Sequence, residues 1–212
     1  MRVEIIELLR CPQPHQASPL VTVAIRRDGD RLIDATLGCA VCGAEYALSD
    51  GVAFLGVALD SDASCDPQAV VDPERIAALL GLGDPGARVM LCGAYGVAAG
   101  AIEKATRATC LVVIGRKSEL PERLPNQLIL GRGSSIPLAN ASLNGLAVDR
   151  AHAALLSDAQ RVVRTGGRVM APAGLPVPTG CRELARDASE WVAEVELSAT
   201  SPVDLLRARP TR

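Results

Sequence analysis

Four residues in the first part of the chain have the types and the spacing of metal ligands. Cys39 and Cys42 form a CxxC turn followed by Gly43, and such a turn supplies two thiolates whose sulfurs face backbone N–H groups. Cys11 is the natural third ligand, and His15, in a proline-rich loop, has the reach to be the fourth. We therefore predict a zinc site. The alternative is that the two CxxC cysteines are small core residues, or a degenerate knuckle that has lost its metal, and that the histidine is a solvated loop residue.

Short β segments must hold these ligands in place. The β-branched runs at residues 20–26 and 31–37 are separated by an Asp-Gly pair at 28–29, which indicates a hairpin because glycine adopts a positive φ at little cost. Further short apolar runs follow the CxxC turn and end at Leu55. We expect a small β module over residues 1–56, with the metal ligands in its loops.

Composition limits the classes of partner. The chain has 212 residues, a net charge of −2, a pI near 5.7 and only 2% aromatic residues. This balance gives no general attraction to nucleic acid or to anionic lipid, and it leaves few rings on which bases could stack. The seven cysteines do not form an even disulfide framework, and the sequence has no signal peptide or long apolar span. We expect a cytoplasmic protein without a membrane or nucleic-acid partner.

The rest of the chain alternates apolar strand-like runs with helical patterns. Residues 57–71 show no hydrophobic period and are interpreted as a linker, and residues 199–212 as a basic tail. Between them, residues 72–198 predict an α/β domain with a mainly parallel, doubly wound sheet. The expected strands are 88–92, 110–114, 127–130, 145–149, 167–171 and 191–198, and the expected helices are 72–81, 97–106, 151–164 and 179–190.

The turn after the first of these strands is the candidate ligand site. Gly93 and Gly96 free the backbone to approach a ligand, and the helix that follows points its N-terminus toward the same place. Tyr95 stands between them, where a small residue normally permits close approach. We expect this turn to mark the cofactor edge of a nucleotide-binding domain.

The N-terminal module resembles a known family. LLRCP at residues 8–12, SPL at 18–20 and CAVCGAEYALSDGVAFL at 39–55 are similar to the small zinc-ribbon proteins that activate tRNA and protein methyltransferases. The family pattern has a cysteine where this chain has Pro14, and we expect His15 to be the substitute ligand. The resemblance implies a zinc ribbon that docks on a methyltransferase.

A second resemblance covers residues 136–170, IPLANASLNGLAVDRAHAALLSDAQRVVRTGGRVM. It is similar to the signature that class I S-adenosylmethionine-dependent methyltransferases carry around their fourth strand, the following helix and the fifth strand, and RVVRTGGR at 161–168 fits closely. The resemblance implies a Rossmann-like methyltransferase sheet with S-adenosylmethionine bound over the glycine turn. It also implies substrate-facing groups at the end of the fourth strand, where Asp149 and His152 lie. His152 would act as a general base; the alternatives are a helix cap for Asp149 and a hydrogen bond to a neighbour for His152.

The family keeps acids at the ends of its first strands because carboxylates accept hydrogen bonds from the cofactor. In this chain those positions fall on Leu91 or Cys92, on Gly115 or Arg116, and on Arg132. We therefore predict a degenerate cofactor edge formed by Gly93, Tyr95, Gly96, Arg116 and Arg132. The predicted function is a methyltransferase-like scaffold or partner subunit with weak or no catalysis, which works with a protein partner or as a homo-oligomer.

Two alternatives remain open. The first is an active S-adenosylmethionine-dependent methyltransferase. The second is an NADP-binding protein, because Arg116 and Lys117 in residues 110–120 could meet a 2′-phosphate. Against the second, neither Tyr46 nor Tyr95 has a lysine four residues on, so the usual short-chain reductase acid is missing.

Overall fold

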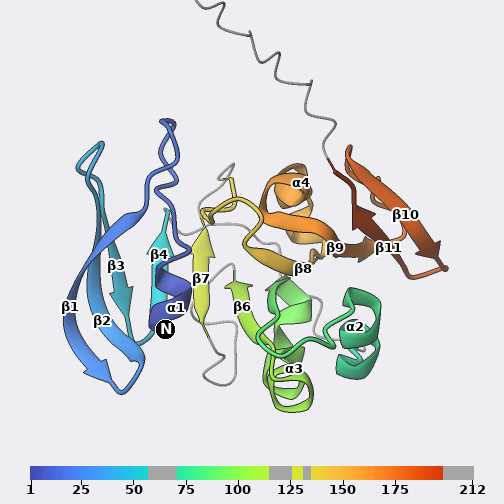
Figure 1. Cartoon of the computed structure of the whole chain (residues 1–212), viewed down its shortest axis with the longest axis horizontal. Helices are drawn as coiled ribbons and strands as arrows, with labels where there is room; N and C mark the ends of the chain where they lie inside the picture. The colour runs from blue at the N-terminus through green and yellow to red at the C-terminus, as the bar shows by residue number, and fades with distance from the viewer. Residues whose placement is uncertain (57–70, 115–125, 131–134, 198–212) are drawn as a thin grey trace, which may run out of the picture.

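A computed structural model describes residues 1–56, 71–114, 126–130 and 135–197 (Figure 1). The strands of these residues form a single sheet in the order β1-β2-β3-β4-β7-β6-β5-β8-β9-β11-β10. The strands are β1 (Leu20–Asp28), β2 (Arg31–Cys39), β3 (Glu45–Ser49), β4 (Val52–Leu55), β5 (Arg88–Cys92), β6 (Thr109–Ile114), β7 (Gln127–Leu130), β8 (Leu143–Ala147), β9 (Val163–Pro172), β10 (Cys181–Arg186) and β11 (Glu190–Val195). The helices are α1 (Val3–Ile6), α2 (Pro73–Leu80), α3 (Ala99–Thr106) and α4 (Ala159–Val162), with 3₁₀ segments η1 (Gly93–Ala98) and η2 (Arg150–Asp158).

The first four strands form an antiparallel meander. The predicted hairpin is confirmed as β1 and β2, and Gly29 in its turn has a φ of +58°. One face of the meander is buried, and Ile5 and Ile6 of α1 belong to the same apolar cluster as Leu37 of β2. This face anchors the loops that carry the candidate ligands.

The predicted doubly wound α/β sheet is confirmed in the second part of the chain. Strands β7, β6, β5, β8 and β9 are parallel, and numbered from β5 their order is 3-2-1-4-5. The hairpin of β11 and β10 continues the sheet, with β11 antiparallel to β9. Helices α2 and α3 contribute to one apolar cluster and α1 and α4 to the other, so helices cover both faces. None of the helices among the described residues is long and apolar enough to cross a membrane.

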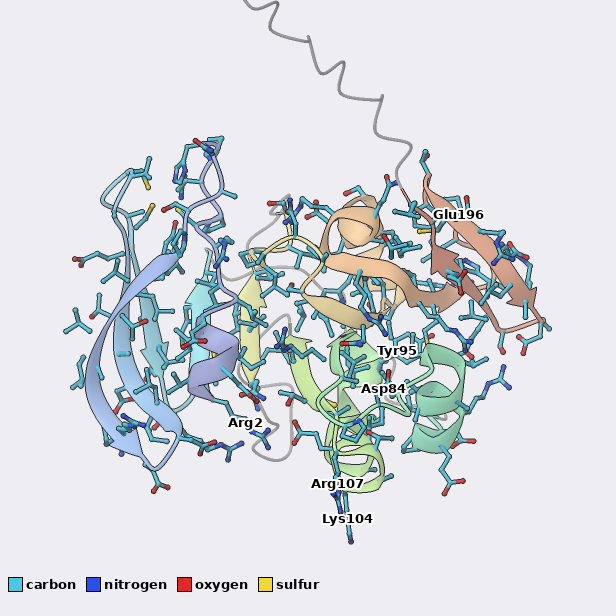
Figure 2. The ribbon with its side chains drawn as sticks, in the orientation of Figure 1. Arg2, Asp84, Tyr95, Lys104, Arg107 and Glu196 are labelled. Carbon is cyan, nitrogen blue, oxygen red and sulfur yellow. The ribbon has the colours of Figure 1, made fainter. Side chains whose placement is uncertain are left out.

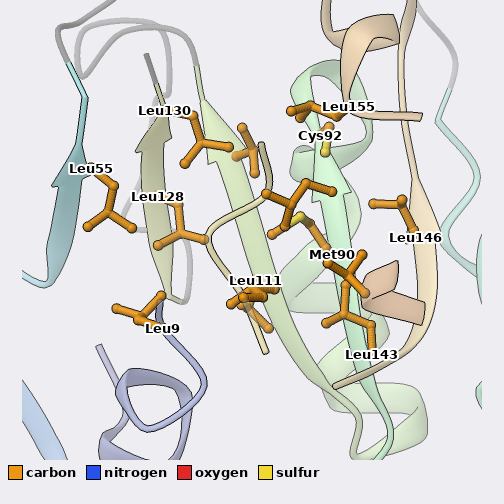
Figure 3. Close-up of a cluster of buried hydrophobic side chains, with 14 of the residues drawn as sticks. Leu9, Leu55, Met90, Cys92, Leu111, Leu128, Leu130, Leu143, Leu146 and Leu155 are labelled. Atoms are coloured by element: carbon orange, nitrogen blue, oxygen red, sulfur yellow. The ribbon is translucent and has the colours of Figure 1, made fainter. Parts of the chain in front are cut away.

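The two parts of the chain share one sheet and one core. β4 of the N-terminal module pairs in parallel with β7 of the α/β part, from Val52 opposite Gln127 to Leu55 opposite Leu130. Leu9 and Leu55 belong to the same buried cluster as Leu128 of β7 (Figure 3). The side chains of the N-terminal module therefore complete the core of the α/β part.

Two expected helices are wrong. The helix expected over 179–190 is replaced by the edge strand β10, because pairing with β11, rather than local propensity, decides the structure of an edge segment. The helix expected over 151–164 is the 3₁₀ segment η2 followed by a short α4, and β9 already begins at Val163. A Cβ at Gly167 would lie 2.7 Å from the Asn144 carbonyl oxygen, so this glycine allows β9 to pack closely against the start of β8.

By contrast, α2 begins and ends where the sequence predicts. Asp72 is the N-cap and accepts hydrogen bonds from the N–H groups of Glu74 and Arg75, while Pro73 occupies the first turn. The helix ends at Gly81 in the left-handed conformation.

The shared core predicts a single unfolding transition. Replacing the buried Leu55 with alanine should lower the free energy of unfolding by about 2–5 kcal/mol, because it leaves a cavity in the core that β4 and β7 share. Trp191, the only tryptophan, lies buried in β11 toward the other edge of the sheet, so its fluorescence reports on the α/β part. In urea denaturation of the Leu55→Ala variant, the transition followed by Trp191 fluorescence should have a lower midpoint than in the wild type. An unchanged Trp191 transition would mean that the module unfolds independently.

Candidate functional site

The four predicted metal ligands lie together. Cys11 follows the short pairing of Arg10 with Pro19, and Cys39 ends β2 just before the turn that carries Cys42. The ligand atoms of Cys11, His15, Cys39 and Cys42 all lie within 4.8 Å of one another. In Figure 1 the two loops concerned extend from the same end of the N-terminal meander.

The spacing of the atoms fits a tetrahedral zinc site. The Sγ atoms of Cys11 and Cys42 are 3.7 Å apart, and His15 Nε2 is 3.5 Å from Cys39 Sγ. Zn–S bonds of about 2.3 Å and a Zn–N bond of about 2.0 Å in a tetrahedron place two sulfurs about 3.8 Å apart and a sulfur and a nitrogen about 3.5 Å apart. The sulfur separation is also far too long for a disulfide, whose S–S bond is about 2.05 Å.

The histidine is oriented for this role. His15 Nδ1 lies 2.7 Å from the carbonyl oxygen of Gln16, which can only accept, so Nδ1 carries the proton and Nε2 keeps its lone pair toward the cysteines. This hydrogen bond to Gln16 is also the main cause that raises the pKa of His15. A metal ion would compete there with a proton.

Backbone and side-chain donors stabilise the sulfurs. The N–H of Cys42, the largest cause, outweighs burial and lowers the pKa of Cys39 to about 6. Burial, followed by a hydrogen bond to Cys11, raises the pKa of Tyr46 to about 12, so its hydroxyl, 3.4 Å from Cys11 Sγ, stays protonated and can donate. This contact of Tyr46 was not predicted from the sequence, although the position of Tyr46 four residues after Cys42 was an available signal. Three sulfurs and one imidazole at these distances can hold Zn²⁺.

At the glycine turn, a carboxylate of the chain itself covers the backbone. Gly93 has a φ of +61°, and a Cβ added there would lie 1.9 Å from Asp149 Oδ2, so only glycine fits. Asp149 Oδ2 accepts the N–H of Ala94 at 3.0 Å. Its Oδ1 accepts the backbone N–H of His152 at 3.0 Å and lies 2.6 Å from the ring Nδ1 of the same residue. The structure thus brings the predicted pair Asp149 and His152 together, with Asp149 as the N-cap of η2.

The charge of Asp149 is stabilised in this position. Burial, the largest single cause, acts to raise its pKa, but the ring and N–H of His152 together with the N–H of Ala94 outweigh burial, and the pKa is lowered. The carboxylate therefore stays ionised at the start of η1, where the N–H groups of the turn point.

Tyr95 is held by a separate set of contacts. Its ring is buried near α2 (Figure 2), and its hydroxyl donates to Glu190 Oε1 at 3.2 Å. Burial, followed by the charge of Glu190, raises the pKa of Tyr95, which keeps the hydroxyl protonated. Arg75 of α2 holds Glu190 and Asp187 at 3.3 and 2.6 Å. This network cannot be predicted from local sequence patterns, because its members lie far apart in the chain.

The structure describes some of the remaining residues at the predicted cofactor edge, and others lie outside the described ranges. Gly96 is buried within η1. Cys92, one candidate for the position of the first acid, is fully buried, and burial, followed by the charge of Asp149, raises its pKa well above the usual range. Arg116 and Arg132 lie outside the described residues, after the ends of β6 and β7.

No protein-family model matches the chain, and no curated protein matches its sequence. The solved structures that match it include methyltransferases. A putative sarcosine dimethylglycine methyltransferase from Galdieria sulphuraria is 15% identical over 47% of this chain and 44% of its own, with a TM-score of 0.36. The antibiotic-resistance methyltransferase Kmr is 13% identical over 64% of this chain and 98% of its own, with a TM-score of 0.41.

A third match is the complex between the Haloferax volcanii Trm112 methyltransferase activator and the putative methyltransferase, at 12% identity, 47% of this chain, 54% of that chain and a TM-score of 0.35. The chain thus spans less than half of the first of these structures and nearly all of the second. Because all three TM-scores are below 0.5, the fold assignment rests on the strand order of the sheet itself.

The metal cluster predicts one bound Zn²⁺ per chain. Cys42→Ser should remove most of the bound zinc, because a serine hydroxyl is a poor zinc ligand. Cys181→Ser is the matched control, since Cys181 is a half-buried thiol of β10 outside the cluster. Metal analysis of the purified proteins checks both. Equal zinc in the two variants would rule out this ligand set.

The buried carboxylate predicts a pH-dependent difference in stability. Asp149→Asn should lower the free energy of unfolding at pH 7 by about 1.5–3 kcal/mol, the range for hydrogen bonds to a charged group. Because the folded-state pKa of Asp149 is lowered, its contribution is present above about pH 4 and is lost as the pH falls through the folded-state value. Urea denaturation from pH 7 to pH 3 should show the two proteins converging. The exposed Asp84→Asn is the control; a constant difference at all pH values would contradict the assignment.

Proposed function

We propose that this chain is a methyltransferase-like protein with a degenerate S-adenosylmethionine site, which acts as a scaffold or partner subunit with weak or no catalysis. The observation that carries this proposal is the position of Asp149. Its carboxylate already accepts the N–H of Ala94 at the turn where a cofactor would bind. The positive end of η1 is therefore neutralised by the chain itself.

The first-strand position supports the same proposal. Cys92 is buried in the apolar core and offers no charged acceptor to a ligand. A hydrogen bond to a charged group contributes about 1.5–3 kcal/mol. If a second of the acids expected at this edge is missing as well, the loss of two such bonds weakens cofactor binding by about a hundredfold or more. A protein of this kind retains the fold and its surfaces while losing affinity for the cofactor.

The N-terminal module has a structural role in this proposal. Cys11, His15, Cys39 and Cys42 would hold Zn²⁺ with four protein ligands, and a closed site of this kind stabilises a fold rather than activating water. The module would act in cis on the α/β part through the pairing of β4 with β7. One matched structure contains an activator and a methyltransferase in complex. In this chain we propose that the equivalent support is built in, and that the further partner is another protein or a second copy of the chain.

Isothermal titration calorimetry of S-adenosylmethionine and S-adenosylhomocysteine into zinc-assayed protein tests the proposal. We expect no saturable binding at micromolar ligand, because the turn is occupied and the first-strand acceptor is missing. Micromolar binding would instead support the active methyltransferase. A parallel titration with NADPH tests the remaining alternative, and micromolar affinity there would replace the proposal with a dinucleotide-binding one.

A further inference from the structure

A short buried segment, residues 136–139, contacts both the metal module and the elements beside the glycine turn. Toward the module, Leu9 forms an antiparallel bridge with Leu138. The Arg10 N–H donates to the Pro137 carbonyl at 2.8 Å, and the Ala139 N–H donates to the Leu8 carbonyl at 2.9 Å. The next residue along the module is the ligand Cys11. The pairing therefore ends directly at the metal cluster.

On its other side the segment is held by η2 and α4. Arg161 donates from Nη1 to the Leu138 carbonyl at 2.7 Å and from Nη2 to the Ile136 carbonyl at 2.5 Å. Asp158, at the end of η2, accepts the N–H of Ile136 and also binds Arg161 Nε at 3.1 Å. The same η2 begins at its N-cap Asp149, the residue that covers Gly93.

This arrangement leaves little freedom for independent movement. Leu9, Leu138 and Ile136 are at most 1% exposed. Interiors are packed as densely as organic crystals, and a buried backbone group that loses its hydrogen-bond partner destabilises the folded state. Displacing residues 8–10 would therefore disturb residues 136–139, and through Arg161 and Asp158 it would disturb η2.

We propose that residues 136–139 couple the metal cluster to the glycine turn, so that metal binding at Cys11 stabilises η2 and the Asp149 cap over Gly93. The proposal rests on the metal site put forward under the proposed function. A metal ion holds Cys11 in place, Leu8 to Arg10 then keep their pairing with the segment, and the segment keeps its contacts with Arg161. Metal loading in this way regulates the local stability of an edge that contains no metal ligand.

Hydrogen exchange measured by mass spectrometry on the full chain tests this coupling, with zinc-loaded and chelator-treated protein compared. We expect zinc to slow exchange about tenfold or more in peptides that cover residues 8–11, 136–142 and 150–158 together. Peptides from β10 should not change. If zinc binds but slows exchange only in the ligand loops, the coupling is wrong while the metal site stands. If no zinc binds, both fail.

Two pairs of variants separate coupling from general destabilisation. Arg161→Lys loses the two-pronged contact, so zinc should still protect residues 8–11 but no longer protect 150–158. Arg164→Lys, an exposed neighbour in β9, should behave like the wild type. Leu9→Ala should accelerate exchange at 136–142 more than Leu37→Ala, which removes an equally buried leucine of the module. Equal effects within either pair would overturn the proposal.

Discussion

The parallel pairing of β4 with β7 is the interaction on which the rest of the structure depends. It converts a small meander and an α/β sheet into one sheet, and it places Leu55 of the module in the same apolar cluster as Leu128. Without this pairing, β7 would be an exposed edge strand with unpaired backbone groups. Both candidate sites are held by elements that pack on this common core: the metal loops at one end, and the glycine turn after β5.

The sequence predicted most strands correctly because their apolar runs are short, β-branched and bounded by turns. The helix at 72–81 was equally predictable from the sequence, since an Asp N-cap, a following proline and a terminal glycine are local signals. Residues 179–190 were wrongly assigned as a helix because their structure depends on β11, a partner that no local pattern reveals. The join of β4 to β7 also lies beyond local patterns, since it pairs segments more than seventy positions apart.

The two candidate sites also divide into features that local sequence signals predict and features that depend on contacts between distant segments. The cluster of Cys11, His15, Cys39 and Cys42 could be predicted because ligand type and spacing carry the chemistry, and the structure places the four together. The cover of Gly93 by Asp149 depends on a contact between two strand ends, so the sequence alone offered only the alternative of a helix cap. The structure explains the first arginine of the RVVRTGGR stretch. Arg161 binds the carbonyls of the IPL stretch that precedes β8, which ties both ends of the signature together.

Carrying the module on the same chain changes the thermodynamics of its attachment. Two separate proteins dock by a bimolecular reaction, so the occupied fraction depends on the concentrations of both. Here the association of β4 with β7 is intramolecular, and a tether of this kind typically gives an effective concentration in the millimolar range. Dilution cannot reverse it, the stoichiometry is fixed at one module per sheet, and the protein behaves as a preassembled complex at any expression level.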